Sequence, residues 1–247
     1  MIILIEIREE NRIYYQFKAF KEIDYINHLF TSRIGWEHSD QAALSNIFKT
    51  SRKKIIALKQ VHGTNILHID REEDDYDEIR RTEADGLITN LPKIVLTTYH
   101  ADCVPLFFLD RLNKAIGMAH AGWRGTFENM AGKMVENMKA IYNSDARDIL
   151  VGIGPAIGKC CYEVGRDVKD NFFERYVEFP DIIENRNGSF YLDLWKVNLL
   201  QLKKAGIPEE NIILSNTCTS CKVDKFYSYR REKGSTGRMI AAISLTE

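Results

Sequence analysis

Short runs of β-branched and aromatic residues recur along almost the whole of this 247-residue chain, and they constrain its fold more than any other feature. Turn residues bound most of these runs, which is the pattern of individual β-strands. We expect strands at Met1–Arg8, Arg12–Phe17, Ile55–Leu58, Asn65–Ile69, Gly86–Thr89, Ile94–Thr98, Leu106–Leu109, Ala115–Ala119, Asp148–Gly152, Ser189–Leu192, Asn211–Ser215, Phe226–Tyr229 and Met239–Ser244.

Helical patterns are fewer. Thr126 is placed to cap a helix whose apolar residues follow at helical spacing as far as Ile141. Asp193 is placed to cap a second helix that ends at Gly206, and a third is expected from Asp167 to Tyr176. Many strands with a few helices in irregular order indicate an α+β fold, with mixed β-sheets packed against flanking helices. Since no linker or repeat interrupts the sequence, we expect residues 1–247 to form a single domain.

The charge balance argues against nucleic acid and anionic membranes as partners. Lys and Arg number 34 and Asp and Glu number 35, so no net field favours nucleic acid or an anionic membrane surface. The acidic run Glu72–Glu78 is most simply a solvated loop.

The apolar N-terminus is interrupted by Glu6 and Arg8, which indicates a first strand and not a signal peptide. With no apolar stretch of spanning length, we expect a cytoplasmic protein.

Five cysteines are an odd number in a chain without an export signal, so a disulfide framework is not expected. Cys218 and Cys221 form a lone CxxC motif, for which buried or incidental thiols are a commoner explanation than a zinc knuckle or a redox pair.

Three short segments each offer one metal-ligand side chain beside a Gly- or Asp-marked turn. His62 follows the expected strand Ile55–Leu58, Cys103 follows Ile94–Thr98, and His120 ends Ala115–Ala119. A histidine alone is usually a core or surface imidazole, but three matching contexts at strand ends favour one shared site. A zinc site with three protein ligands keeps its fourth position open for chemistry, whereas structural sites normally use four. The pattern therefore predicts an enzyme.

Several motifs together resemble the YfiH/laccase-domain family, in the same order and over about Ser32 to Ile240. They are Lys59–Gly63 (KQVHG), Ala84–Ile88 (ADGLI), Ala101–Pro105 (ADCVP), Gly117–Gly125 (GMAHAGWRG), Gly152–Gly158 (GIGPAIG), Cys161–Val164 (CYEV), Phe226–Arg231 (FYSYRR) and Thr236–Arg238 (TGR).

The resemblance implies a fold similar to the catalytic domain of a deamidating bacterial toxin. It implies either a polyphenol oxidase or a purine nucleoside phosphorylase, with a metal on His62, Cys103 and His120. The chain departs from the family pattern at His100, which would add a further imidazole near the metal. It also departs at residues 36–40, so no substrate contact is carried over there. Cys160 and Cys221 are extra to the pattern.

Zinc with an open position activates water or polarises a substrate oxygen, whereas phosphorolysis also needs an anion site. Guanidinium groups suit bidentate contacts with phosphate, and Arg33 and Arg230 are our candidates among Arg33, Arg124, Arg230, Arg231 and Arg238. Asp102 is a candidate to orient a ligand imidazole or to act as acid or base, although a turn-forming aspartate is an equally common role. Phe226–Tyr229 could stack on a purine or form a core strand.

Three rival functions differ in the ligands they need. A His₂Cys set also suits copper, and phenol oxidation by bound copper is one alternative, but a laccase cluster needs more imidazoles than six histidines supply. A cysteine hydrolase would use Cys103 as nucleophile and His120 as base, and would leave His62 without a role. A metal-stabilised binding module would need a closed four-ligand site.

We therefore predict a zinc-dependent purine nucleoside phosphorylase. It would convert adenosine, inosine or methylthioadenosine and phosphate into free base and ribose 1-phosphate derivatives, with adenosine deamination as a side activity. The candidate catalytic residues are Cys103, Asp102, Arg33 and Arg230. The sequence does not indicate the oligomeric state.

Overall fold

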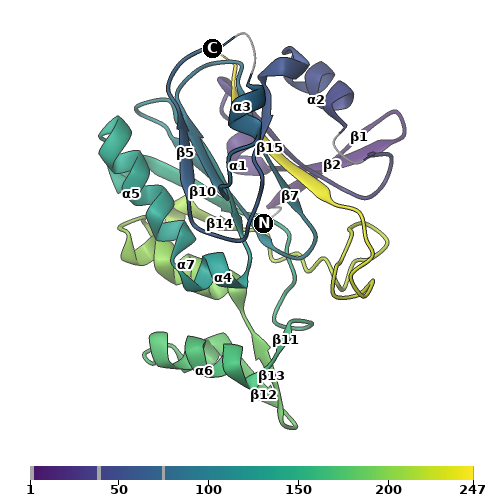
Figure 1. The fold of residues 1–247 in the computed structure, drawn as a ribbon, viewed down its shortest axis with the longest axis vertical. Coiled ribbons are helices and arrows are strands. Elements are labelled where there is room, and N and C mark those ends of the chain that lie inside the picture. The colour runs from purple at the N-terminus through teal and green to yellow at the C-terminus, as the bar shows by residue number, and fades with distance from the viewer. Residues whose placement is uncertain (1–2, 38–39, 74–75, 247) are drawn as a thin grey trace.

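The computed structural model describes residues 3–37, 40–73 and 76–246, and Figure 1 shows their arrangement. Three sheets occur in these ranges. The first has the order β1 (Leu4–Glu9), β2 (Arg12–Phe17), β3 (Ile26–Thr31), β15 (Met239–Leu245), β7 (Val95–His100) and β4 (Ile55–Ala57). The second has the order β14 (Ile212–Leu214), β10 (Ile149–Ile153), β8 (Val104–Asp110), β9 (Ala115–Ala121), β6 (Gly86–Thr89) and β5 (Ile66–Ile69). The third has the order β11 (Glu163–Val164), β13 (Ser189–Leu192) and β12 (Ile183–Arg186).

The helices flank these sheets. They are α1 (Lys18–Lys21), α2 (Gln41–Phe48), α3 (Asp77–Arg80), α4 (Trp123–Phe127), α5 (Met130–Tyr142), α6 (Arg166–Arg175) and α7 (Leu194–Lys204). Single 3₁₀ turns lie at Arg52–Lys54, Ala146–Asp148, Pro180–Ile182 and Glu209–Asn211. None of the described helices is long and apolar enough to cross a membrane.

The two large sheets pack face to face, and helices cover their outer faces. In β8 every residue is buried, and alternate side chains point to different cores. Phe107 packs between the sheets with residues such as Phe17 and Phe30. Phe108 packs on the other side, with side chains of α5 and α7. On the far side α2 covers the first sheet, while α6 and the third sheet form the lower end of the molecule in Figure 1.

The predicted α+β class with mixed sheets and flanking helices is confirmed, because both large sheets contain parallel and antiparallel pairs. Single-domain organisation over residues 1–247 stays a prediction. The strands expected at Arg12–Phe17, Gly86–Thr89 and Ser189–Leu192 have the predicted bounds. The first two residues of the predicted strand Met1–Arg8, and residues 74 and 75 of the acidic run, lie outside the described residues.

Two predictions about local structure are wrong. Thr126 does not cap a long helix but lies inside α4, and α5 starts only after Asn129, whose φ of +66° breaks the helix. Asparagine tolerates this left-handed conformation better than most residues. Residues 226–229 form no strand: they run through a bend and into a turn, with Phe226 in the core and Tyr229 54% exposed. The helix capped by Asp193 is confirmed, since that carboxylate accepts a hydrogen bond from the Lys196 amide at 3.0 Å.

Candidate metal centre

Two imidazoles and one thiol converge at the ends of the two large sheets. The ligand atoms of His62, Cys103 and His120 all lie within 4.8 Å of one another. His62 is in the loop between β4 and β5, Cys103 is in the turn between β7 and β8, and His120 is the penultimate residue of β9. The three segments that were singled out by their turns thus share one site.

The pairing of β8 with β9 brings Cys103 and His120 together. These strands are antiparallel, and Pro105 lies opposite His120, so the turn before β8 reaches the end of β9. Gly122 then lets the groups approach. A Cβ atom there would lie 3.0 Å from Cδ2 of His62 and 3.1 Å from Sγ of Cys103. Any side chain at this position would crowd both ligands.

Asp85 organises the site, although the sequence alone does not mark it as a functional residue. Its Oδ1 accepts hydrogen bonds from Nδ1 of His120 at 2.8 Å and from the His62 amide at 3.1 Å. Its Oδ2 accepts from the amides of Val61 at 3.1 Å and Gly63 at 2.7 Å. A carboxylate behind a ligand imidazole fixes the ring orientation and the tautomer. Asp85 belongs to the ADGLI motif, whose residues after Asp85 form β6. Strand β6 pairs with β9, and this pairing places Asp85 beside His120.

His62 has a left-handed backbone, with φ of +61°. Few residues other than glycine adopt this conformation without strain. The three amide hydrogen bonds to the Asp85 carboxylate hold the loop in this shape. Asp102, beside Cys103, is a second left-handed residue, with φ of +84°. Backbone strain is therefore present in two of the loops that supply ligands.

The thiol and the imidazole of His120 stabilise each other in their charged forms. Burial acts to raise the pKa of the Cys103 thiol, but the charge and hydrogen bonds of His120 and His62 outweigh it and lower the pKa to about 6. Burial acts to lower the pKa of His120, but Cys103 and Asp85 raise it to about 9. Without a metal, Cys103 is thus a thiolate at neutral pH.

The ligand set fits a metal ion. It combines imidazole nitrogen and thiolate sulfur, a combination that suits zinc or copper. The thiol is already poised to deprotonate, and the carboxylate of Asp85 supports one imidazole from behind. Because the group offers three ligands, a fourth position would be left for another molecule.

Asp102 does not orient a ligand imidazole, so that part of the prediction is wrong. Its Oδ1 accepts from the Thr219 hydroxyl at 2.6 Å, and its Oδ2 accepts from the Ser228 hydroxyl at 3.0 Å and the Arg230 amide at 2.8 Å. The carboxylate is buried and ties the 215–238 segment to the turn that carries Cys103. Its role as an acid or base stays a prediction.

His100 does not supply a fourth ligand atom. The ring is buried, Nε2 lies 2.8 Å from the Thr98 hydroxyl, and Nδ1 lies 3.1 Å from the carbonyl oxygen of Cys103. Both ring nitrogens are thus engaged. The ring instead supports the backbone of Cys103 from inside the protein.

The two arginines predicted to bind phosphate differ in their surroundings. Arg33 forms an ion pair with Glu232 at 3.1 Å, donates to the carbonyl of Val223 at 2.6 Å and stacks on Tyr227. It ties two segments of chain together, which leaves it poorly placed to bind an anion. Arg230 donates to the carbonyl of Glu163 at 2.6 Å, and no carboxylate in the described ranges pairs with it.

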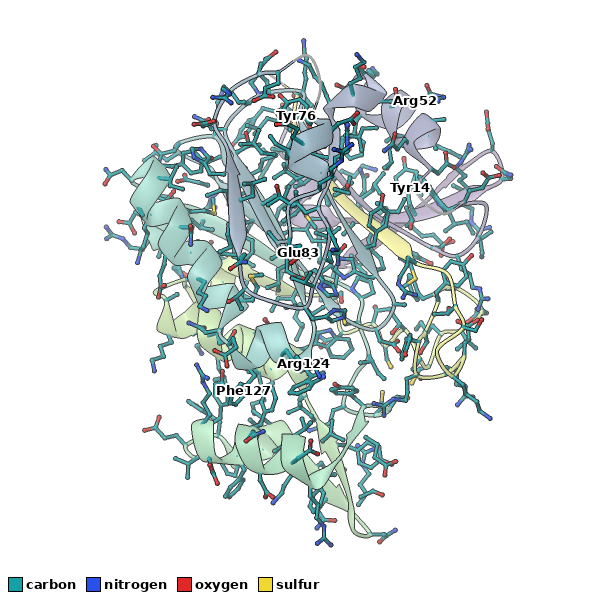
Figure 2. The ribbon with its side chains drawn as sticks, viewed as in Figure 1. Tyr14, Arg52, Tyr76, Glu83, Arg124 and Phe127 are labelled. Carbon is teal, nitrogen blue, oxygen red and sulfur yellow. The ribbon has the colours of Figure 1, made fainter. Side chains whose placement is uncertain are left out.

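A second cation, Arg124, lies near the same place. Its guanidinium stacks on Trp123 at 4.4 Å, and no described acidic residue forms an ion pair with it. Figure 2 shows Arg124 on α4, on the side of the main body that faces α6 and the third sheet. Tyr162 is close to Arg230, whose guanidinium carbon lies 5.1 Å from the centre of its ring, and both Arg230 and Arg124 influence its titration. Burial first, and then Cys103, raise the pKa of Tyr162, while Arg230 and Arg124 act against them.

Comparison with known families identifies one family that spans most of the chain. The family model described as "Multi-copper polyphenol oxidoreductase laccase" matches residues 38–246. The chain belongs to this family. The resemblance to YfiH/laccase-domain proteins that the motifs indicated is therefore confirmed.

Relatives within the family include proteins named as phosphorylases. "Purine nucleoside phosphorylase YlmD" of Geobacillus stearothermophilus is 39% identical over 198 residues, which are 78% of this chain and 72% of that protein. Human "Purine nucleoside phosphorylase LACC1" is 32% identical over 208 residues, which are 83% of this chain and 46% of that protein.

Solved structures have the same fold. The crystal structure of YlmD from Geobacillus stearothermophilus has a TM-score of 0.87 at 31% identity and covers 99% of this chain and 100% of its own. That of the Bacillus licheniformis hypothetical protein YfiH has a TM-score of 0.84 at 30% identity and covers 96% of this chain and 97% of its own.

Proposed function

We propose that this chain is a zinc-dependent purine nucleoside phosphorylase whose metal ligands are His62, Cys103 and His120. The observation that carries the proposal is the three-ligand group with Asp85 behind it, together with Arg124 and Arg230, which act on the same Tyr162 as Cys103 does and have no carboxylate partner among the described residues. The printed names of the relatives support this class of reaction. Adenosine, inosine and methylthioadenosine are the substrates we propose.

In the proposed reaction an oxygen of phosphate attacks C1′ of the nucleoside. The bond from C1′ to the purine nitrogen breaks, its electron pair goes to the base, and the base takes up a proton. Zinc supplies Lewis acidity at such a site when bound. Arg230 and Arg124 would bind and orient the phosphate, because guanidinium groups match its oxygens. Tyr162 keeps its proton at neutral pH and can therefore donate a hydrogen bond to the substrate.

Adenosine deamination is the side activity we propose for the same site. There water replaces phosphate as the nucleophile, attacks C6 of the base, and ammonia leaves. This reaction needs an acid or base group as well as an activated water. Asp102 is the nearest candidate in the sequence, although its three hydrogen bonds make it first of all a structural residue.

Product analysis with adenosine separates these reactions. We expect adenine and ribose 1-phosphate only when phosphate is present, and inosine without phosphate if deamination occurs. Cys103→Ala should abolish both together with the zinc of this site. Arg230→Gln should raise KM for phosphate, whereas Arg147→Gln, an exposed arginine paired with Asp145, should change nothing. Phosphate-independent turnover alone, or adenosine left intact by zinc-loaded protein, would contradict phosphorolysis.

A cysteine hydrolase is the second candidate, because Asp85, His120 and Cys103 are connected in the order of a catalytic triad. The lowered pKa of Cys103 and the raised pKa of His120 describe an activated thiolate. Chelation distinguishes the two candidates. A hydrolase should gain amidase activity when zinc is removed, whereas a phosphorylase should lose its activity.

Copper-dependent phenol oxidation remains the third candidate, and copper reconstitution with a phenol substrate tests it.

A further inference from the structure

Four cysteines from two distant parts of the sequence form a second cluster. The Sγ atoms of Cys160, Cys161, Cys218 and Cys221 all lie within 4.8 Å of one another. Cys221 lies 3.4 Å from both Cys160 and Cys161, and all of them are free thiols. The sequence favoured buried or incidental thiols for Cys218 and Cys221, and the structure adds a second pair of thiols beside them.

The sheet brings the two pairs of cysteines together. Strands β10 and β14 are parallel neighbours, with Val151 opposite Ile212, so the chain leaves both strands at the same end. The segments that follow them continue side by side, with an isolated bridge between Ala156 and Cys218. The amide of Thr219 donates to the carbonyl of Ala156 at 3.0 Å. The cluster is thus fixed by regular backbone pairing.

The geometry matches a single tetrahedral ion. Zinc–sulfur bonds of about 2.3 Å in a tetrahedron place the sulfurs about 3.8 Å apart. The two distances of 3.4 Å and the limit of 4.8 Å lie on either side of this value. A set of four thiolates selects zinc or iron over magnesium or calcium. Four protein ligands also close the coordination shell, as in structural sites.

The backbone around the cluster is shaped for thiolate sulfur. The amide of Gly158 donates to Sγ of Cys218 at 3.2 Å. The amide of Lys222 donates to the carbonyl of Cys218 at 3.2 Å, which closes a tight turn across the CxxC motif. A Cβ atom on Gly158 would lie 2.9 Å from the Trp195 ring and 3.2 Å from Sγ of Cys160. Glycine here lets the chain pass close to the cluster.

We propose that Cys160, Cys161, Cys218 and Cys221 bind one zinc ion as a structural site, separate from the three-ligand site. A pair of disulfides is the competing arrangement. The position of Cys221, equally distant from two neighbouring thiols, favours a shared ion over a unique sulfur partner. This proposal does not depend on the proposed phosphorolysis.

The cluster also supports the turn that carries Cys103. The amide of Ile157, from the first cysteine segment, donates to the carbonyl of Asp102 at 2.9 Å. The hydroxyl of Thr219, from the second segment, donates to the Asp102 carboxylate at 2.6 Å. A metal that clamps these two segments would hold both donors in place. Loss of this metal should therefore weaken metal binding at the three-ligand site as a secondary effect.

Metal content of the purified whole chain tests the proposal. With one ion per ligand group, we expect about two zinc ions per wild-type chain and about one in Cys103→Ala. The double variant Cys218→Ser, Cys221→Ser should lose the other zinc. Lys222→Ala is the matched control, since this exposed residue follows the motif without offering a ligand, and it should keep both ions.

Cobalt gives a second readout that needs no activity. Cobalt-loaded Cys103→Ala should show the strong thiolate-to-cobalt absorption of an all-sulfur site, and the double cysteine variant should lose it. If the double variant does not fold, Cys160→Ser, which keeps three thiols, should release zinc to a chelator faster than wild type. Unchanged zinc content and release rate in these variants would overturn the proposal. Disulfides found by mass spectrometry in freshly purified wild-type protein would overturn it as well.

Discussion

Asp85 accepts four hydrogen bonds at the candidate metal centre, and replacing it with asparagine tests whether this carboxylate organises the site. Each oxygen accepts two of them, from His120 and the His62 amide on one side and from Val61 and Gly63 on the other. In Asp85→Asn the new NH₂ group must face one of these two pairs of donors. Two hydrogen bonds are lost if this group faces Val61 and Gly63, and at least one, from the His62 amide, if it faces the other pair, where His120 can accept only in its other tautomer.

The magnitude follows from the burial of the donors. An unsatisfied buried donor costs about 1–3 kcal/mol, so two would lower the free energy of unfolding by about 2–6 kcal/mol. The loop at His62 is exposed, and water can replace part of what is lost there. We therefore expect a loss of about 2–3 kcal/mol in metal-free protein. Without its carboxylate partner the His120 ring should also bind metal about 10–100-fold more weakly.

Two measurements on the same samples check these values. Denaturant unfolding of the metal-free proteins gives the change in stability, and competition with a chromophoric chelator gives the change in zinc affinity. Glu83→Gln is the matched control, because this neighbouring carboxylate is exposed and forms a surface ion pair with Lys59. It should change both quantities little. An Asp85→Asn protein with wild-type zinc affinity would refute the role assigned to Asp85.

Three further predictions concern titration and packing. Burial lowers the pKa of His28 to about 3, below about 6.5 in the unfolded chain, so its stabilisation is complete above pH 6.5 and is lost as the pH falls towards 3. Between pH 7 and 4.5 wild type should lose about 2–3 kcal/mol more stability than His28→Gln in denaturant titrations, and equal losses would contradict this. In metal-free protein, alkylation of Cys103, followed by peptide mass spectrometry, should rise with pH around a midpoint of about 6, and a midpoint above pH 8 would disprove the thiolate. Gly122→Ala should weaken zinc binding in chelator competition because its Cβ crowds two ligands, whereas Gly63→Ala, with contacts of 3.6 Å or more, should bind zinc like wild type.

Local sequence patterns predicted the elements that depend on local interactions. The helix after Asp193 was predictable because its cap and its closing glycine are close in sequence. Strand β3 was missed because Asn27 and His28 interrupt its apolar pattern. The buried His28 ring is satisfied by the Phe17 amide of the neighbouring strand, a contact that a single-strand pattern does not show.

The residues of the candidate site also divide into those that local sequence signals reveal and those that only strand pairing brings together. His62, Cys103 and His120 were found because each stands beside its own turn signal. Asp85 was missed because its partners are 22–35 residues away and depend on the pairing of β6 with β9. The four-cysteine cluster was missed for the same reason, since its two halves are about sixty residues apart and meet only through β10 and β14.

At position 62 the backbone conformation and the candidate metal site favour different residues, because His62 has a left-handed backbone. A glycine would adopt φ of +61° without the penalty of roughly 1–2 kcal/mol that other residues incur, yet it offers no ligand atom. His62→Gly should therefore make the metal-free protein somewhat more stable while it removes one metal ligand. Selection for stability alone would drive this loop towards glycine. His62 instead gives up backbone stability for an imidazole whose ligand atom lies within 4.8 Å of those of Cys103 and His120.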